Sequence, residues 1–160
     1  DLATVTTKGG QQLFVRTLLP AGARIAASTY QPKTGDERPA QGEPMTAVLR
    51  VEPRSMDNDV RFLHVLEGAS AGAAPTPSVA LKSSAGTPYA GAAVKDVAVL
   101  FPVALGPVAD VEVPIPSGVG RVLVTGLEPG GGYQASRDGS KVVVKKGGSQ
   151  RADGGGVLDF

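Results

Sequence analysis

The stretch YQASRDGSKVVVKK, Tyr133 to Lys146, holds two extended segments on either side of a tight-turn signal. Asp138-Gly139 is a residue pair suited to the positive φ angles of a hairpin turn. After the turn, Val142 and Val144 share one side of an extended chain, and two lysines and a valine share the other. The stretch therefore predicts an antiparallel hairpin with one buried face.

The rest of the chain repeats this pattern of short segments rich in Val, Leu and Thr, separated by Gly, Pro, Asn or Asp. They lie at 13–19, 23–30, 46–53, 60–66, 78–82, 94–101, 109–115, 120–127, 132–137, 141–146 and 156–160. No window of about a dozen residues carries an apolar period of about 3.6 with helix caps. We expect an all-β fold, an antiparallel β-sandwich of about ten to twelve short strands, forming a single domain over residues 1–160. The small-residue stretch EGASAGAAPTP (67–77) reads as a loop.

Composition narrows the classes of partner. Lys and Arg total 16 against 15 Asp and Glu, so no net field favours nucleic acid or an anionic membrane surface. No apolar run reaches the roughly 20 residues of a membrane span. There is no cysteine, which excludes disulfides and thiolate chemistry. We expect a protein without nucleic-acid or membrane partners.

Motifs for cofactors and metals are missing from the sequence. It contains no GxxxxGK[ST], no strand-linked GxGxxG, no HExxH and no GxSxG, so we expect no organic cofactor. One histidine and no cysteine are too few for a zinc site. Asp57 and Asp59 in MDNDV resemble the front of a calcium loop but lack its downstream Gly and Glu. They are candidate calcium ligands, and a surface turn is the alternative.

The only histidine, His64, lies in VRFLHVLEG (60–68). In an extended chain it shares a face with Val60, Phe62 and Leu66, which we expect to point into the core. One interpretation is a hydrogen-bonded histidine in a half-buried strand. The other places it at a groove edge or an interface, where a pKa near neutrality suits an acid, a base or a switch.

Two further side chains are candidates for a substrate cleft or an interface. Arg61, three residues before His64, is a cation suited to attract an anionic glycan. Tyr133 is one of only three tyrosines in a chain without tryptophan, and it is a candidate contact for sugar. No catalytic residue is predicted.

Four strings occur in order along the chain: LFVRTLLPAGARI (13–25), AVLRVEPRSMDNDVRFLHVLEG (47–68), GLEPGGGYQAS (126–136) and GGGVLDF (154–160). Together they resemble the C-terminal β-sandwich region of heparinase II/III-type polysaccharide lyases. Such lyases cleave acidic, uronate-containing polysaccharides by β-elimination, with catalytic Tyr, His, Asn and Arg residues chiefly in a helical toroid. No residue here matches a catalytic motif of that family.

The resemblance implies a non-catalytic C-terminal module of a longer, secreted or periplasmic enzyme. Its partners would be the catalytic domain of the parent chain and the acidic polysaccharide, whose cleft it would help to form. We expect Leu18 to Pro20 and the strand at 97–100 to form an apolar patch against that domain. The alternative from another class is an independent immunoglobulin-like module that binds carbohydrate or protein, or serves adhesion. A small hydrolase using His64 is a third interpretation.

Overall fold

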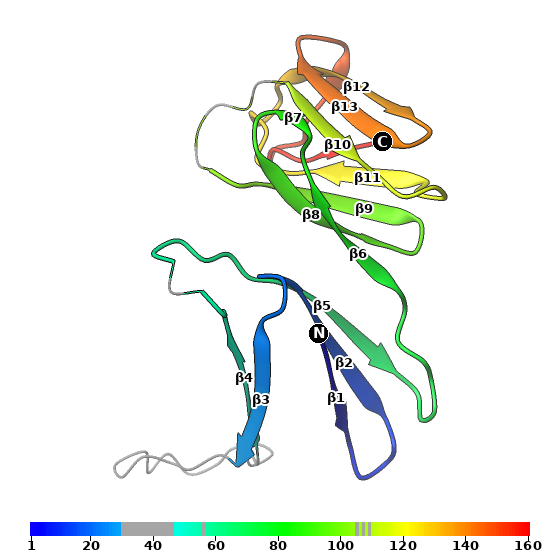
Figure 1. Cartoon of the computed structure of the whole chain (residues 1–160). Coiled ribbons are helices and arrows are strands. Elements are labelled where there is room, and N and C mark those ends of the chain that lie inside the picture. Colours follow the sequence, from blue (N-terminus) through cyan, green and yellow to red (C-terminus); the bar gives the residue numbers. More distant parts are fainter. Residues whose placement is uncertain (30–46, 56, 105, 107, 109) are drawn as a thin grey trace. The chain divides into compact units, whose positions relative to one another are not determined.

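The computed structural model describes residues 1–29, 47–55, 57–104, 106, 108 and 110–160. These residues form fifteen strands joined by turns, and the described part of the chain contains no helix. The prediction of an all-β, sandwich-like fold is therefore confirmed. The chain divides into two compact units, Asp1–Ala71 and Gly72–Phe160, called unit 1 and unit 2 below (Figure 1). A single sandwich domain over 1–160 stays a prediction.

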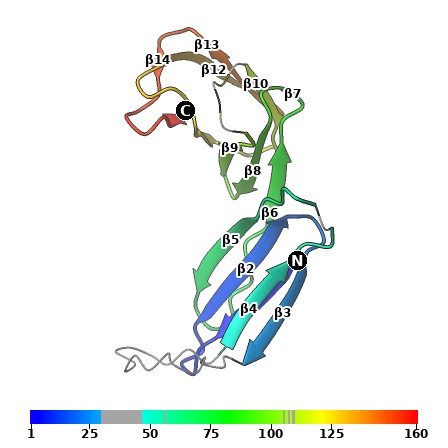
Figure 2. The ribbon, with the colours of Figure 1, turned by 90° about the vertical axis from the view of Figure 1, so that its left-hand side faces the viewer.

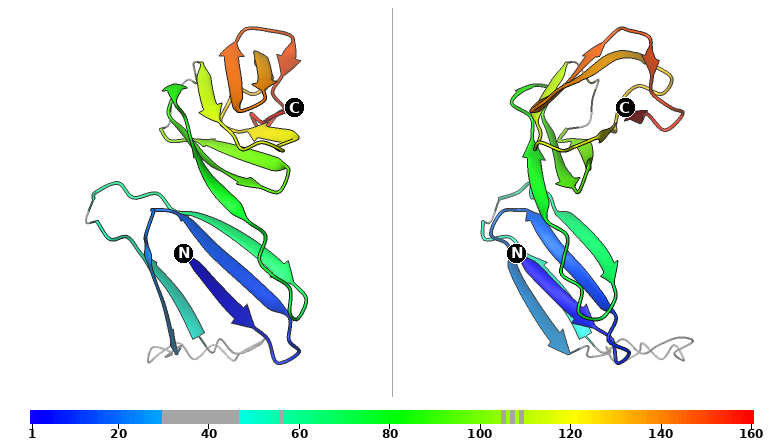
Figure 3. Two further views of the ribbon diagram at one scale, coloured as in Figure 1. Left: turned by 45° about the vertical axis from the view of Figure 1, so that its right-hand side comes forward. Right: turned by 90° about the vertical axis from the view of Figure 1, so that its right-hand side faces the viewer.

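Unit 1 contains a three-stranded and a two-stranded sheet, both antiparallel. The larger sheet has the order β1-β2-β5, with β1 at Leu2–Thr6, β2 at Gln12–Leu19 and β5 at Leu63–Ala69 (Figure 3). The smaller sheet pairs β3, Arg24–Thr29, with β4, Ala47–Glu52. The three strands of the larger sheet run side by side because β2 pairs with both neighbours along most of its length.

The covered face of the larger sheet is the one that carries Phe14, which is 4% exposed. Phe14 pairs with Glu67, and Arg16 pairs with Val65, so Val65 and Glu67 are the β5 residues on this covered face. The prediction that the face carrying His64 points into the core is wrong for Phe62 and Leu66, which are 46% and 63% exposed, whereas Val60 and His64 are half-buried. Alternate residues of β5 do face opposite sides of the sheet, but those on the covered side are Val65 and Glu67.

Unit 2 is built from two five-stranded sheets (Figure 2). Its strands are β6 Ser78–Lys82, β7 Ala85–Gly86, β8 Tyr89–Val94, β9 Val97–Pro102, β10 Val111–Pro114, β11 Arg121–Val124, β12 Gly132–Asp138, β13 Lys141–Lys146, β14 Gln150–Arg151 and β15 Leu158–Asp159. One sheet has the order β14-β12-β13-β10-β7, and the other has the order β15-β11-β9-β8-β6. All pairs are antiparallel except β9 with β11, which is parallel.

The core of unit 2 lies between these sheets, and it follows the period of two seen in the sequence. Val142 and Val144 of β13 are fully buried, and they form one cluster with Leu100 of β9 and Val122 of β11. Since both sheets contribute to the same cluster, unit 2 is a β-sandwich. The hairpin is also confirmed, with Asp138 paired to Lys141. The turn residues are thus Gly139 and Ser140, one position later than expected, with Gly139 at φ 46°.

Two residues that were expected in the apolar patch lie in the core instead. Ala98 and Leu100 are fully buried in the core of unit 2, so this part of the patch is wrong. The intervening Val97 and Val99 are half-buried and point away from that core, because side chains alternate along a strand. Leu18 to Pro20 are half-buried in unit 1.

The burial of Tyr89 leads to a prediction about the stability of unit 2 at alkaline pH. Its side chain is fully buried, and its hydroxyl donates a hydrogen bond to the Thr125 carbonyl oxygen at 2.8 Å. Burial, with a smaller effect from Tyr133, raises the pKa of Tyr89 to about 12. An unfolded tyrosine titrates near pH 10, so the folded state holds the proton over this interval and stability falls from about pH 10 to about pH 12.

We expect Tyr89→Phe to remove most of this loss. The free energy of unfolding of the wild type and the variant should be measured by urea titration at several pH values from neutral to about pH 11. Equal slopes against pH in the two proteins would contradict the assignment.

Candidate functional site

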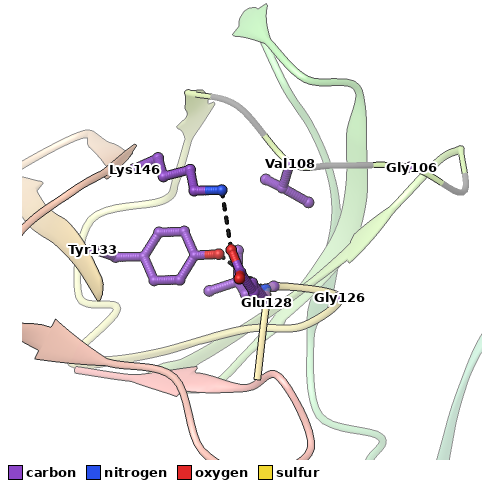
Figure 4. A pocket seen from close by; sticks show the side chains of 7 residues that line it. Gly106, Val108, Gly126, Glu128, Tyr133 and Lys146 are labelled. Carbon is purple, nitrogen blue, oxygen red and sulfur yellow. Dashed lines mark hydrogen bonds and ion pairs between the residues drawn. The ribbon is translucent and has the colours of Figure 1, made fainter. Parts of the chain in front are cut away.

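A pocket of about 250 Å³ lies in unit 2 beside Tyr133, and we call it the Tyr133 pocket (Figure 4). Its lining residues are Gly106, Val108, Gly126, Leu127, Glu128, Tyr133 and Lys146. The Tyr133 ring comes from β12 and points toward Glu128, which follows β11, while Lys146 ends β13. Three segments that are distant in sequence therefore supply its polar groups.

Hydrogen bonds and one ion pair hold this pocket together. The Tyr133 hydroxyl oxygen accepts a hydrogen bond from the Glu128 backbone N–H at 2.9 Å. The Lys146 Nζ lies 3.0 Å from the Glu128 Oε2, and both side chains are well exposed. The hydrogen bond and the charge of Glu128 raise the pKa of Lys146. Because the pair faces solvent, it contributes orientation more than stability.

The backbone turn before Glu128 requires glycine. Gly126 has φ +72°, which is in the left-handed region that side chains disfavour. A Cβ atom at Gly126 would also lie 2.5 Å from Cγ of Pro102. The turn is therefore tight, and it brings Leu127 into the core and Glu128 to the pocket.

The polar groups of the Tyr133 pocket suit a hydroxyl-bearing ligand. Lys146 supplies N–H donors and Glu128 supplies carboxylate acceptors. Tyr133 is 1% exposed, so it forms a buried wall of the pocket beside these charged groups. Val108 and Leu127 add apolar surface. Sugar hydroxyls both donate and accept, as this set requires.

His64 lies in unit 1 and is half-buried in β5. Its Nδ1 is 3.1 Å from the Thr17 hydroxyl oxygen, and its ring stacks on Phe62 with a centroid distance of 6.1 Å. Thr17 is 4% exposed. These contacts are those of a hydrogen-bonded histidine in a half-buried strand. A place for His64 in a cleft or interface stays a prediction.

The bond between His64 and Thr17 yields a stability prediction. His64→Ala leaves the buried Thr17 hydroxyl without this partner, so we expect a loss of about 1 kcal/mol in the free energy of unfolding. In a double-mutant cycle with Thr17→Val, the two losses should overlap by about 1 kcal/mol. Urea unfolding measures all four proteins, and additive losses would mean that the bond contributes nothing.

Arg61, Asp57 and Asp59 lie at the surface before β5. Arg61 Nη2 is 2.8 Å from Asp59 Oδ2, so the guanidinium engages one of the two proposed calcium ligands. The described residues contain no group of three or more His, Cys, Asp or Glu side chains that could hold a metal ion. Calcium binding by Asp57 and Asp59 stays a prediction.

The structure places the predicted site residues in two groups. His64, Arg61, Asp57 and Asp59 belong to unit 1, and Tyr133 belongs to unit 2. Sequence reasoning missed the two charged residues of the Tyr133 pocket. One signal was available for Lys146, because the hairpin register places it opposite Tyr133. The position of Glu128 is set by the turn at Gly126, and the sequence around Glu128 carries no comparable signal.

Two comparisons with known protein sequences found no match. No protein-family model matches the chain. Among curated proteins, none matches it significantly. No helix that could cross a membrane occurs in the described part of the chain.

Proposed function

We propose that this chain is a non-catalytic β-sandwich module of a secreted or periplasmic polysaccharide lyase that acts on an acidic, uronate-containing polysaccharide. In this proposal it supports the catalytic domain and contributes to the substrate cleft. The resemblance to heparinase II/III-type lyases is its basis. The resembling strings supply residues that build the two units, since Phe14, Leu127, Tyr133 and Leu158 are all buried. A supporting role requires such residues and no catalytic group.

The observation that carries the proposal is an exposed apolar face in unit 1. Val5, Leu13 and Leu66, called the Leu66 face, are 49%, 38% and 63% exposed. Leu13 of β2 pairs with Val5. Val15, two residues further along β2 and on the same side as Leu13, pairs with Leu66. The three side chains of the Leu66 face therefore share one side of the sheet. Exposed apolar groups on one face mark a contact surface. The proposed occupant is the catalytic domain of the parent polypeptide.

The natural gene product provides the test. We expect its intact mass to exceed the 16.2 kDa of this chain several-fold. We also expect it to release unsaturated uronate, detected by ultraviolet absorbance, from at least one uronate polysaccharide. The isolated chain should show no turnover. A natural product near 16.2 kDa without lyase activity would remove the proposal.

Variants of the natural product test the Leu66 face itself. Leu66→Glu places a charge on the proposed contact and should lower the melting temperature of the whole enzyme. Gln134→Glu is the matched control, because it adds the same charge at an exposed position of β12 in unit 2. Equal effects of the two substitutions would argue against a covered Leu66 face.

The Tyr133 pocket favours a second candidate, an independent immunoglobulin-like module that binds carbohydrate. Its donor and acceptor groups come from a folded sandwich and need no other domain. Calorimetric titration of the isolated chain with neutral and acidic oligosaccharides would then give a measurable Kd. Glu128→Gln and Lys146→Met should each weaken that binding. No heat of binding across the panel would exclude this candidate.

A further inference from the structure

The outer faces of the two sheets in unit 2 differ in polarity. In the sheet that contains β12 and β13, the side chains opposite the core are largely polar or charged: Glu112, Gln134, Ser136, Asp138, Lys141 and Lys145. In the other sheet the polar outer side chains are Ser78 and Lys82 of β6, Arg121 of β11 and Asp159 of β15, and the remaining eight are apolar: Ala80, Ala90, Ala92, Val94, Val97, Val99, Phe101 and Leu123. We call this second set the Val99 face. An antiparallel sheet with its outer face in water normally carries polar side chains there.

The register fixes which residues form the Val99 face. Ala98 and Leu100 of β9 point into the core, so Val97, Val99 and Phe101 point outward. Val99 pairs with Ala92 of β8 on one side and with Leu123 of β11 on the other. Phe101 is 43% exposed at one end of this face. Apolar side chains thus extend without interruption across neighbouring strands.

Side-chain size is distributed unevenly across this face. At one side of the face, β6 and β8 contribute Ala80, Ala90 and Ala92, while β9 and β11 contribute the larger Val99, Phe101 and Leu123. A two-fold axis parallel to the strands would set the large side chains of one copy over the alanines of the other. Because a two-fold interface is self-complementary, the large side chains of the second copy would likewise lie over the alanines of the first. We propose that unit 2 forms a symmetric dimer through the Val99 face, with a second copy of this chain as its partner.

Lys82 and the Arg121–Asp159 ion pair lie at opposite margins of the face. Lys82 ends β6 on the outer side, and no ion-pair partner for it occurs among the described residues. Asp159 of β15 lies at the opposite margin, where Arg121 binds it through two nitrogens at 2.9 and 2.6 Å. The two-fold axis brings Lys82 of each copy to the margin of the other that carries Asp159. Each carboxylate oxygen can accept a further hydrogen bond.

The area of the face sets the expected strength of the dimer. Five strands about 4.8 Å apart and about five residues long give a flat footprint of about 400 Å² on each copy. Such an interface lies below the standard size, so we expect a weak dimer with a Kd of about 10 to 100 µM. The inference does not depend on the proposed function, because it concerns another surface and can be tested on the chain alone.

Sedimentation equilibrium of the 160-residue chain from about 5 to 500 µM tests the dimer, since this range brackets the expected Kd. We expect the wild type to pass from monomer to dimer. Val99→Lys should leave it monomeric throughout, since it buries an unpaired charge. Val143→Lys is the matched control, because Val143 is also a half-buried valine in mid-strand but lies on the polar outer face of the other sheet. It should dimerise as the wild type does.

Two further variants keep the test decisive. Ala80→Lys places a long side chain among the alanines at an exposed edge position, so it should weaken the dimer at least tenfold even if Val99→Lys does not fold. Lys82→Glu should weaken it a few-fold at low salt. Circular dichroism checks that each protein is folded. A wild type that stays monomeric up to about 500 µM, or equal weakening by Val99→Lys and Val143→Lys, would overturn the inference, because the expected Kd lies well below that limit.

Discussion

Replacing Leu100 by alanine is expected to lower the free energy of unfolding of unit 2 by about 3 kcal/mol. Leu100 is fully buried in the cluster between the two sheets, where Val122 and Val144 also lie. The substitution removes apolar contacts and leaves a cavity that strands paired on both sides cannot easily close. Because β9 pairs with β8 and β11, its backbone cannot move into the space without breaking a ladder.

Leu66→Ala is the matched control for this prediction. Leu66 also lies in a β-strand, but it is 63% exposed. In the isolated chain its replacement should change the free energy of unfolding by less than about 0.5 kcal/mol. Hydrogen exchange of amides in β8, β9 and β11 reports unit 2 directly and separates it from unit 1. Similar losses for the two leucines would mean that Leu100 does not lie in a closed core.

The sequence predicted those parts of the fold that depend on alternation within one strand. Val142 and Val144 are buried as expected, because a sandwich core accepts every second side chain of each inner face. The hairpin at Gly139 follows from local backbone preferences, which need no information from distant segments. Both features depend only on neighbouring residues.

Features that depend on which face is covered were not predictable in the same way. The segment around His64 is apolar on both sides, with Phe62 and Leu66 on one face and Leu63 and Val65 on the other. Its orientation is therefore set by Phe14 of β2, through a pairing between residues far apart in the chain. The outer side of β9 is another example. Val97 and Val99 are as apolar as a core pair, yet Ala98 and Leu100 fill the core.

The boundary between the two units illustrates a second limit. It falls between Ala71 and Gly72, within the small-residue stretch at 67–77. Composition identifies this stretch as a loop, although β5 continues into it as far as Ala69. Composition says nothing of how contacts are divided on either side, because that division depends on strand pairing. The charged pair of the Tyr133 pocket depends on long-range pairing for the same reason.

Gly91→Ala is expected to destabilise unit 2 by about 3 kcal/mol, although it adds a single methyl group. Gly91 lies in β8 on the side of the core, opposite Leu100 in the ladder. A Cβ atom at Gly91 would overlap the Val99 carbonyl oxygen and lie 2.9 Å from Cδ2 of Leu100. Relief requires β8 and β9 to separate, which lengthens their hydrogen bonds and disturbs the inner face of both strands.

Gly154→Ala adds the same methyl group at a position where a Cβ atom would have no neighbour within 4 Å. It should leave the melting temperature nearly unchanged, whereas Gly91→Ala should lower it by about 10 °C or more, at about 4 to 8 °C per kcal/mol for a unit of this size. Thermal unfolding followed by circular dichroism makes the comparison. Equal melting temperatures would show that β8 and β9 can separate locally at little cost. The close approach of these strands would then not be what sets the stability of the sandwich.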